Sequence, residues 1–89
     1  MVEANVELTI CMRAEKQGWF QRKIAYPGRR GATDRLFLKD GRHVWIEFKD
    51  QGKEPSALQR NNRKRMMEHG AECHVVDNIA DGMRILGLQ

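Results

Sequence analysis

Apolar residues at helical spacing open the chain, and a strand-like segment follows them. Val6, Ile10 and Ala14 recur every four residues, which predicts a first helix that Gly18 can end. Residues 19–26 are rich in aromatic and apolar side chains, and this composition is typical of a strand. The chain therefore begins with a helix and then enters a sheet.

A loop and a hairpin come next. Residues 27–32 contain one proline and two glycines, so they form a turn or a loop. Residues 33–38 and 43–49 alternate apolar with polar side chains, and Asp40 and Gly41 stand between them. Asp-Gly between two such segments is a strong hairpin signal, because glycine accepts a positive φ at little cost. We therefore expect two antiparallel strands here.

The second half of the chain predicts a helix, a strand and a last helix. Ser56 is a good N-cap, and Gln59 stands three residues later, which is the spacing of a capping box. The helix that they begin should run to His69. Residues 72–77 indicate a fourth strand, and Asn78 can cap the final helix.

The order of the elements predicts the fold class. It is α-β-β-β-α-β-α in a single, stand-alone domain of residues 1–89. The two strands that flank the middle helix should run parallel, because a helix crosses between them. We therefore expect an α/β fold with a mixed central sheet flanked by helices. A chain this short buries only roughly 60–65% of its unfolded surface, so a partner subunit would add to its stability.

Composition indicates the cellular compartment and the class of binding partner. The chain has 16 Lys and Arg residues against 12 acids, a net charge of +4, and bases cluster at Arg29, Arg30 and residues 60–65. Two basic clusters near an acidic hairpin favour a polyanion with phosphates. Cys11 and Cys73 match neither a zinc site nor a disulfide framework. The N-terminus does not resemble a signal peptide and no segment approaches the length of a membrane span, so we expect a reducing cytoplasm and no membrane partner.

Two acids and a lysine stand among the apolar residues of the hairpin. Alternation places Glu47 and Lys49 side by side on one face of their strand. Asp34 opens the preceding strand, so the hairpin can set it opposite Glu47. A hard cation such as Mg²⁺ takes oxygen ligands, and the two carboxylates and the Phe48 carbonyl can supply them. With Lys49 next to an attacking water or a phosphate, the set predicts phosphodiester hydrolysis.

Simpler interpretations of these residues stay open. Glu47 and Lys49 can form an ion pair on an exposed strand, worth about 0–1 kcal/mol. Asp34 can be a turn residue. Trp19 and Trp45 can stack on bases, although burial is the commoner fate of tryptophan in a small domain.

The order and spacing of these features resemble a known family. The chain resembles a stand-alone VRR-NUC domain, the virus-type replication–repair nuclease branch of the PD-(D/E)XK superfamily. In that family a helix with a glutamate, a G-x-P-D segment, an (E/D)-x-K strand and a helix with a glutamine follow one another. The matching residues are Glu3 or Glu7, the segments 31–34 and 47–49, and Gln59. Thr33 departs from the pattern, because it stands where the family usually has proline.

The resemblance implies a nuclease site and its metal. The implied ligands of a Mg²⁺ or Mn²⁺ ion are Asp34, Glu47, the Phe48 carbonyl and Glu3, with Glu7 as the alternative to Glu3. Lys49 would act in catalysis, and Gln59 would bind the shell of water around the metal or the nearby backbone, besides its capping role. The implied activity is endonucleolytic hydrolysis of DNA without a small-molecule cofactor, in the cytoplasm of a bacterial host if the gene belongs to a phage.

Branched DNA is the partner that we expect, cut by a homodimer. The residues expected to contact DNA are Lys23, at a basic position of the family, and Arg29, Arg30, Arg35, Arg60, Arg63 and Lys64. The apolar residues offered for a dimer interface are Ile79, Met83, Ile85 and Leu86 in the last helix and Val6, Ile10 and Met12 in the first. A two-fold dimer would present two symmetric active sites to a four-way (Holliday) junction. The same apolar residues can instead complete the monomer core.

Two other classes of function compete with the nuclease. A catalytically silent nucleic-acid-binding module on the same fold would bind DNA without Mg²⁺-dependent cutting. A small protein-interaction domain with solvated charges would show no salt-dependent affinity for DNA.

Overall fold

The computed structural model describes residues 2–25 and 33–89, and the side chains of residues 6–25 and 35–89. The elements are α1 (Val2–Lys16), β1 (Phe20–Ala25), β2 (Thr33–Lys39), β3 (Arg42–Phe48), α2 (Ala57–Glu68), β4 (Glu72–Val76) and α3 (Ile79–Leu86). This is the predicted order, and the mixed α/β fold class is confirmed. Within the described ranges, no helix is long and apolar enough to cross a bilayer.

The four strands form one mixed sheet in the order β1-β2-β3-β4. The β1–β2 and β2–β3 pairs are antiparallel, whereas β3 and β4 are parallel, as expected for strands joined through α2. Lys39 pairs with Arg42 across the two-residue turn, where Asp40 has a φ of 50° and Gly41 a φ of 84°. Positive φ at both positions is what a type I′ turn requires, so the Asp-Gly hairpin is confirmed.

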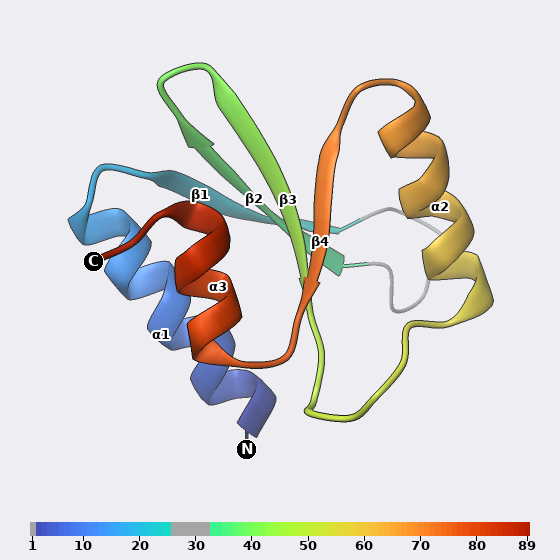
Figure 1. Ribbon diagram of the computed structural model, residues 1–89, viewed down its shortest axis with the longest axis horizontal. Helices are drawn as coiled ribbons and strands as arrows, with labels where there is room; N and C mark the ends of the chain where they lie inside the picture. Colours follow the sequence, from blue (N-terminus) through green and yellow to red (C-terminus); the bar gives the residue numbers. More distant parts are fainter. Residues whose placement is uncertain (1, 26–32) are drawn as a thin grey trace.

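Helices cover both faces of the sheet, but unequally. Helices α1 and α3 pack together on one face, and α2 lies on the other (Figure 1). The side chains that are completely buried all lie between the sheet and the first pair of helices or within that pair. The largest of them are Phe37, Ile10, Ile46, Val44 and Val76. The rings of Trp19 and Phe48 meet Phe37 edge-on, with centroid distances of 6.4 and 6.5 Å.

Helix α3 lies directly on α1. The side chain of Asn78 accepts a hydrogen bond from Asp81 N at 2.8 Å and caps α3. A Cβ atom on Gly82 would lie 2.7 Å from Ile10 Cδ1, so only glycine permits this approach of the two helices. Burial of the thiol between these elements raises the pKa of Cys11 to about 11, and Cys11 and Cys73 are both buried and form no disulfide.

The apolar residues offered for a dimer interface belong mostly to this core. Val6, Ile10 and Leu86 are buried, and the other three residues of α3 pack against them. Met12 differs, because 59% of its surface is exposed. The alternative, that these residues complete the monomer core, is therefore correct for all of them except Met12.

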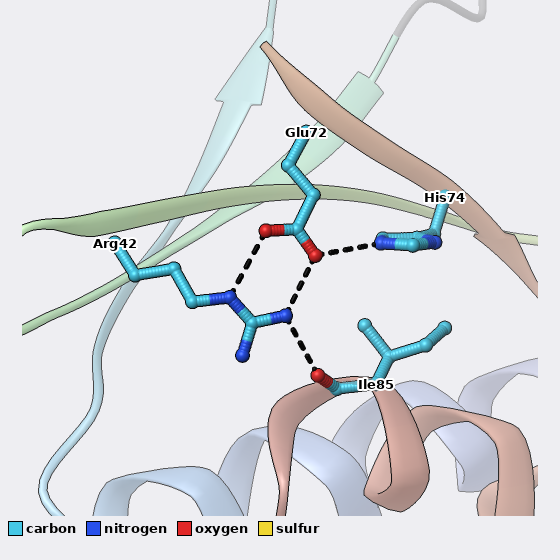
Figure 2. Close-up of polar contacts among 4 residues, drawn as sticks. All are labelled: Arg42, Glu72, His74 and Ile85. Atoms are coloured by element: carbon cyan, nitrogen blue, oxygen red, sulfur yellow. Dashed lines mark hydrogen bonds and ion pairs between the residues drawn. The ribbon is translucent and has the colours of Figure 1, made fainter.

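A polar cluster ties the edge of the sheet to α3 (Figure 2). Arg42 donates from Nε and Nη2 to the Glu72 carboxylate at 2.9 and 2.6 Å, and from Nη2 to the carbonyl of Ile85 at 2.9 Å. His74 Nε2 lies 2.9 Å from Glu72 Oε2. The hydrogen bonds from Arg42 are the main reason that the pKa of Glu72 falls to about 2. The cluster thus joins β3, β4 and α3 through one ionised carboxylate.

Helix α2 is stabilised by its own capping rather than by burial. Ser56 Oγ accepts from Gln59 N at 3.1 Å and Gln59 Oε1 accepts from Ser56 N at 2.8 Å, so the predicted capping box is confirmed. No residue of α2 is fully buried. Leu58 and Met67 have 56% and 52% of their surface exposed. This helix therefore lies over its face of the sheet without sealing it.

Candidate active site

Glu47 is a buried acid on the face of the sheet that α2 covers. Its neighbours Ile46 and Phe48 point into the core on the opposite face, and only 9% of the Glu47 side chain is exposed. Lys49 Nζ lies 3.0 Å from Glu47 Oε2. The predicted pairing of these two residues on one face is confirmed. The simpler interpretation required an exposed strand, and the burial of Glu47 removes that premise.

The Glu47 carboxylate is incompletely satisfied inside the protein. Its Oε1 atom lies 3.8 Å from Arg63 Nη1, a distance for an ion pair but not for a hydrogen bond. Glu47 Oε2 and Arg63 Nη1 are both buried without a hydrogen-bond partner among the described residues, although Lys49 is within ion-pair distance. A buried polar atom without a partner costs free energy, roughly 1–3 kcal/mol or more for a charged group. An oxygen of this kind is suited to a cation that binds later.

Asp34 occupies the position opposite Glu47. The β2–β3 ladder ends with the pair of Arg35 and Ile46, and one further step of this antiparallel register would set Asp34 against Glu47. On its other side, the backbone of Asp34 pairs with Ile24 of β1. Directly opposed residues share a face of the sheet, so Asp34 and Glu47 are placed on the same face. The Asp34 side chain lies outside the described residues.

These residues fit a hard divalent cation. A carboxylate with an unbonded oxygen, a second carboxylate at the opposed position and a main-chain carbonyl are the ligand types that Mg²⁺ and Mn²⁺ prefer. The side chain of Phe48 is buried in the core, so this residue can contribute only its carbonyl. Among the described side chains, no group of three or more His, Cys, Asp or Glu residues lies together as a metal site. The side chains of Asp34 and Glu3 lie outside that search.

The acids of α1 are placed differently. Arg35 donates to Glu7 Oε2 from Nε at 2.8 Å, its Nη2 lies 2.7 Å away, and Lys23 Nζ lies at 3.7 Å. Arg35 pairs with Ile46, whose side chain is in the core, so Glu7 lies on the α1 face, opposite to Glu47. Glu3 lies in the first turn of α1, and its side chain is outside the described residues.

The predicted DNA-binding residues divide into three groups. Arg29 and Arg30 lie outside the described residues. Arg35 and Lys23 are held by Glu7, and Arg35 also donates to Gln21 at 2.6 Å. The remaining three residues, Arg60, Arg63 and Lys64, lie on α2.

The three bases of α2 have different surroundings. Arg60 is exposed, lies 3.9 Å from Glu54 and donates to the carbonyl of Pro55 at 2.9 Å. Lys64 is exposed. Arg63 instead points inward to Glu47, with 22% of its side chain exposed. The structure thus brings Arg63 into the candidate site, where the sequence reading had grouped it with the surface bases.

The sequence analysis did not place Arg63 at the site, although its spacing from Gln59 could have indicated this. Arg63 follows Gln59 by four residues, so both lie on the same side of α2. If Gln59 serves the site as expected, the side of α2 that carries it must face the sheet. A narrow cavity of about 10 Å³ marks this contact, and it is lined by Trp45, Glu47, Arg63, Met66, Cys73 and His74.

Comparisons with known proteins bear on the family and the fold. No family model matches the chain. A protein named "Putative nuclease p44", from Acyrthosiphon pisum secondary endosymbiont phage 1, is 31% identical over 77 residues, which cover 85% of this chain and 83% of that protein. A solved structure named "VRR_NUC domain" superposes with a TM-score of 0.86 and 29% identity, over 98% of this chain and 96% of that chain.

Proposed function

The chain belongs to the VRR-NUC family of nuclease domains, within the PD-(D/E)XK superfamily, and from this membership we propose that it is a Mg²⁺- or Mn²⁺-dependent endonuclease of branched DNA. The observation that carries the proposal is the Glu47 carboxylate, which is buried beside Lys49 with one oxygen lacking a hydrogen bond. A nuclease that uses a bound cation explains why a small domain keeps this unsatisfied group.

Asp34, Glu47 and the Phe48 carbonyl would hold the metal. Glu3 is the better candidate than Glu7 for a further ligand, because the Glu7 carboxylate is already paired with Arg35. When bound, the ion would supply an activated water and neutralise charge on the phosphoryl group. The two carboxylates orient what they bind because their strands are fixed in the sheet.

Lys49 and Gln59 complete the proposed machinery. Lys49 Nζ lies 3.0 Å from Glu47 Oε2, and with DNA bound its ammonium would stand next to the scissile phosphate or the attacking water. Gln59 is fixed by its capping box at the start of α2, and we propose that it binds the water shell of the metal or the nearby backbone. Arg63 would help to keep the Glu47 carboxylate in place.

The remaining bases supply contacts to DNA phosphates. Arg60 and Lys64 on the exposed side of α2 suit this role. We propose the same role for Arg29 and Arg30, which precede β2 in the sequence. Lys23 has 54% of its side chain exposed and can contact DNA beside its ion pair. Arg35 is only 16% exposed and is bonded to Glu7, so its contribution would be to order β2 rather than to bind DNA directly.

We also propose that the active form is a homodimer that resolves four-way junctions. Leu8 and Met12 support a dimer surface on α1, because they stand one helical turn apart with 59% of each exposed. A two-fold dimer would place two active sites in symmetry, as two symmetric cuts in a junction require. The setting would be the cytoplasm, where buried free thiols such as Cys11 and Cys73 stay reduced.

The test of the nuclease is a cleavage assay on labelled duplex, flap, single-stranded and four-way-junction DNA with Mg²⁺, Mn²⁺ or EDTA. We expect cutting with either metal, none with EDTA, and preference for the branched substrates. Lys49→Ala should lower turnover at saturating DNA far more than affinity. Binding without cutting in any metal would favour the catalytically silent module, and no salt-dependent binding at all would favour the protein-interaction domain.

The dimer has its own test. Sedimentation of the wild-type protein at micromolar concentration should give a dimer, and the double variant Leu8→Glu, Met12→Glu should give a monomer of about half that mass. A wild-type monomer would remove the dimer, and equal affinity for junction and duplex of the same length would remove the junction preference. Neither result would alter the assignment of Glu47.

A further inference from the structure

A groove starts on the α2 face of the sheet beside Glu47 and continues to the first residues of β3 and β4. The narrow cavity at Glu47 shares Trp45 and Met66 with an open hollow of about 520 Å³, which also contains Asn62, Arg65, His69 and Ala71. A second open hollow of about 460 Å³ shares Trp45, His69 and Ala71 with the first and continues to Gly41, Arg42, His43, Gly70 and Glu72. We call these adjoining hollows the Trp45 groove.

Uncommitted basic groups line the Trp45 groove. The side chains of His43, Arg65 and His69 make no hydrogen bond or ion pair with any residue that the structure describes. The acid in the lining, Glu72, is already bound by Arg42 at 2.9 and 2.6 Å. The groove therefore offers donors and positive charge, without a free carboxylate to repel a phosphate.

Trp45 stands in the middle of the groove. It alternates with the core residues Val44 and Ile46, so it points to the α2 face, and it is only partly buried. Trp19 is the contrast: it is 6% exposed and packs edge-on against Phe37. Trp45 lines both open hollows, so part of its side chain can be reached from solvent.

An unpaired nucleotide is the ligand with the matching chemistry. Free bases stack on aromatic rings with little sequence preference, and phosphates bind nearby cations. Base pairs inside a duplex have their flat faces covered by their neighbours, so they cannot use such a ring without being unstacked. Trp45 precedes Glu47 by two residues on the same face, which is about 7 Å along the strand. A base on this ring would lie next to the candidate site.

We propose that the Trp45 groove binds unpaired nucleotides of the DNA substrate, with a base stacked on Trp45 and the backbone phosphates at Arg65 and His69. The inference rests on the proposed nuclease function and adds to it the place where the single-stranded part of a branched substrate lies. It also gives the enzyme a physical reason to prefer branched DNA to continuous duplex.

The test is binding in EDTA, where no cleavage occurs. Fluorescence anisotropy compares a labelled 15-nucleotide oligothymidylate with a duplex of the same length. Trp45→Ala should bind the single strand on the order of 10-fold more weakly, with duplex affinity unchanged, while Trp45→Phe stays within about 3-fold of wild type because it keeps a stacking ring. Lys64→Ala, an exposed base of α2 outside the groove, is the matched control and should weaken both ligands equally.

Three results would overturn the proposal. They are an equal loss of affinity in Trp45→Ala and Trp45→Phe, an equal loss of affinity for single strand and duplex, and no loss of affinity at all. If Trp45→Ala does not fold, the exposed double variant Arg65→Ala, His69→Ala replaces it, with the same expected selectivity and the same overturning results. The proposed nuclease activity is tested separately, by DNA cleavage by the wild-type protein with Mg²⁺. Selective single-strand binding without any cleavage would defeat the nuclease and leave the groove standing.

Discussion

The two faces of the sheet differ in how far their charged side chains are hydrogen-bonded. On the α1 and α3 face, the cations next to the strands have partners. Arg35 and Lys23 meet Glu7, Arg42 meets Glu72, and Lys39 donates to the carbonyl of Gln17 at 2.6 Å. On the α2 face, Glu47 Oε2 and Arg63 Nη1 are buried without a hydrogen bond among the described residues. The first face satisfies its charges around an apolar core, whereas the second leaves charge unsatisfied.

This difference separates stability from function within 89 residues. A closed core and satisfied ion pairs lower the free energy of the folded state, whereas unsatisfied groups raise it unless a ligand is bound. Positions where a protein breaks its own folding rules are expected at functional sites. The α1 and α3 face is therefore the folding face, and the α2 face is the working face.

The largest effect should come from the working face. Glu47→Gln and Asp34→Ala should each abolish metal-dependent cleavage, because each removes a carboxylate from the proposed cation site. Far-ultraviolet circular dichroism should stay that of the wild type, since Glu47 is not part of the apolar core and Asp34 lies at the start of β2. Substantial cleavage by either variant would disprove the assignment of that residue.

A substitution in the core of the folding face should destabilise the protein rather than remove its activity. Phe37 is completely buried and meets the rings of Trp19 and Phe48, so Phe37→Ala should lower the free energy of unfolding by about 3–5 kcal/mol. Urea denaturation measures this loss. Leu58→Ala on α2, where the side chain is 56% exposed, is the control and should change stability by less than about 0.5 kcal/mol. Similar losses in both variants would show that the two faces are not distinct.

A smaller effect should appear at acid pH on the folding face. The pKa of Glu72 falls from 4.5 to about 2, so its contribution to stability is fully present above pH 4.5 and is lost as the pH falls towards 2. About a third of the side chain is exposed, so solvent screening limits the contribution to about 1 kcal/mol. Comparing the urea stability of wild type and Glu72→Gln between pH 7 and pH 2 checks this: the gap should close on acidification. A constant gap would mean that the carboxylate does not act through its charge.

The smallest effect should distinguish two neighbouring bases of α2. Lys64→Ala should flatten the dependence of log affinity for duplex DNA on log salt by about one unit, as expected for one lost phosphate contact. Arg63→Met should leave this slope unchanged, because Arg63 faces Glu47, and should instead alter the affinity for Mn²⁺ measured by calorimetry without DNA. If Arg63→Met changes the salt slope as much as Lys64→Ala, Arg63 is a DNA contact and not part of the site.

Local signals accounted for most of the fold. The Asp40–Gly41 turn, the Ser56–Gln59 capping box and the Asn78 cap depend on residues within four positions of one another, so short-range geometry alone predicted them. Strand alternation likewise placed Glu47 and Lys49 together, and the 3.0 Å ion pair confirms it. The family followed from the order of these features, since the order does not depend on packing.

Contacts between distant elements decided the rest. Whether the apolar side of α3 meets another subunit or α1 depends on the close approach at Gly82, which no periodicity reveals. Arg63 and Arg35 are equally basic in the sequence, yet one faces Glu47 and the other is bonded to Glu7, because α2 and α1 lie on opposite faces of the sheet. Spacing along a chain determines which side of an element a residue occupies. Only tertiary packing decides whether that side meets a core, a charge or open solvent, as it does in leaving Trp45 at the edge of a groove while burying Trp19.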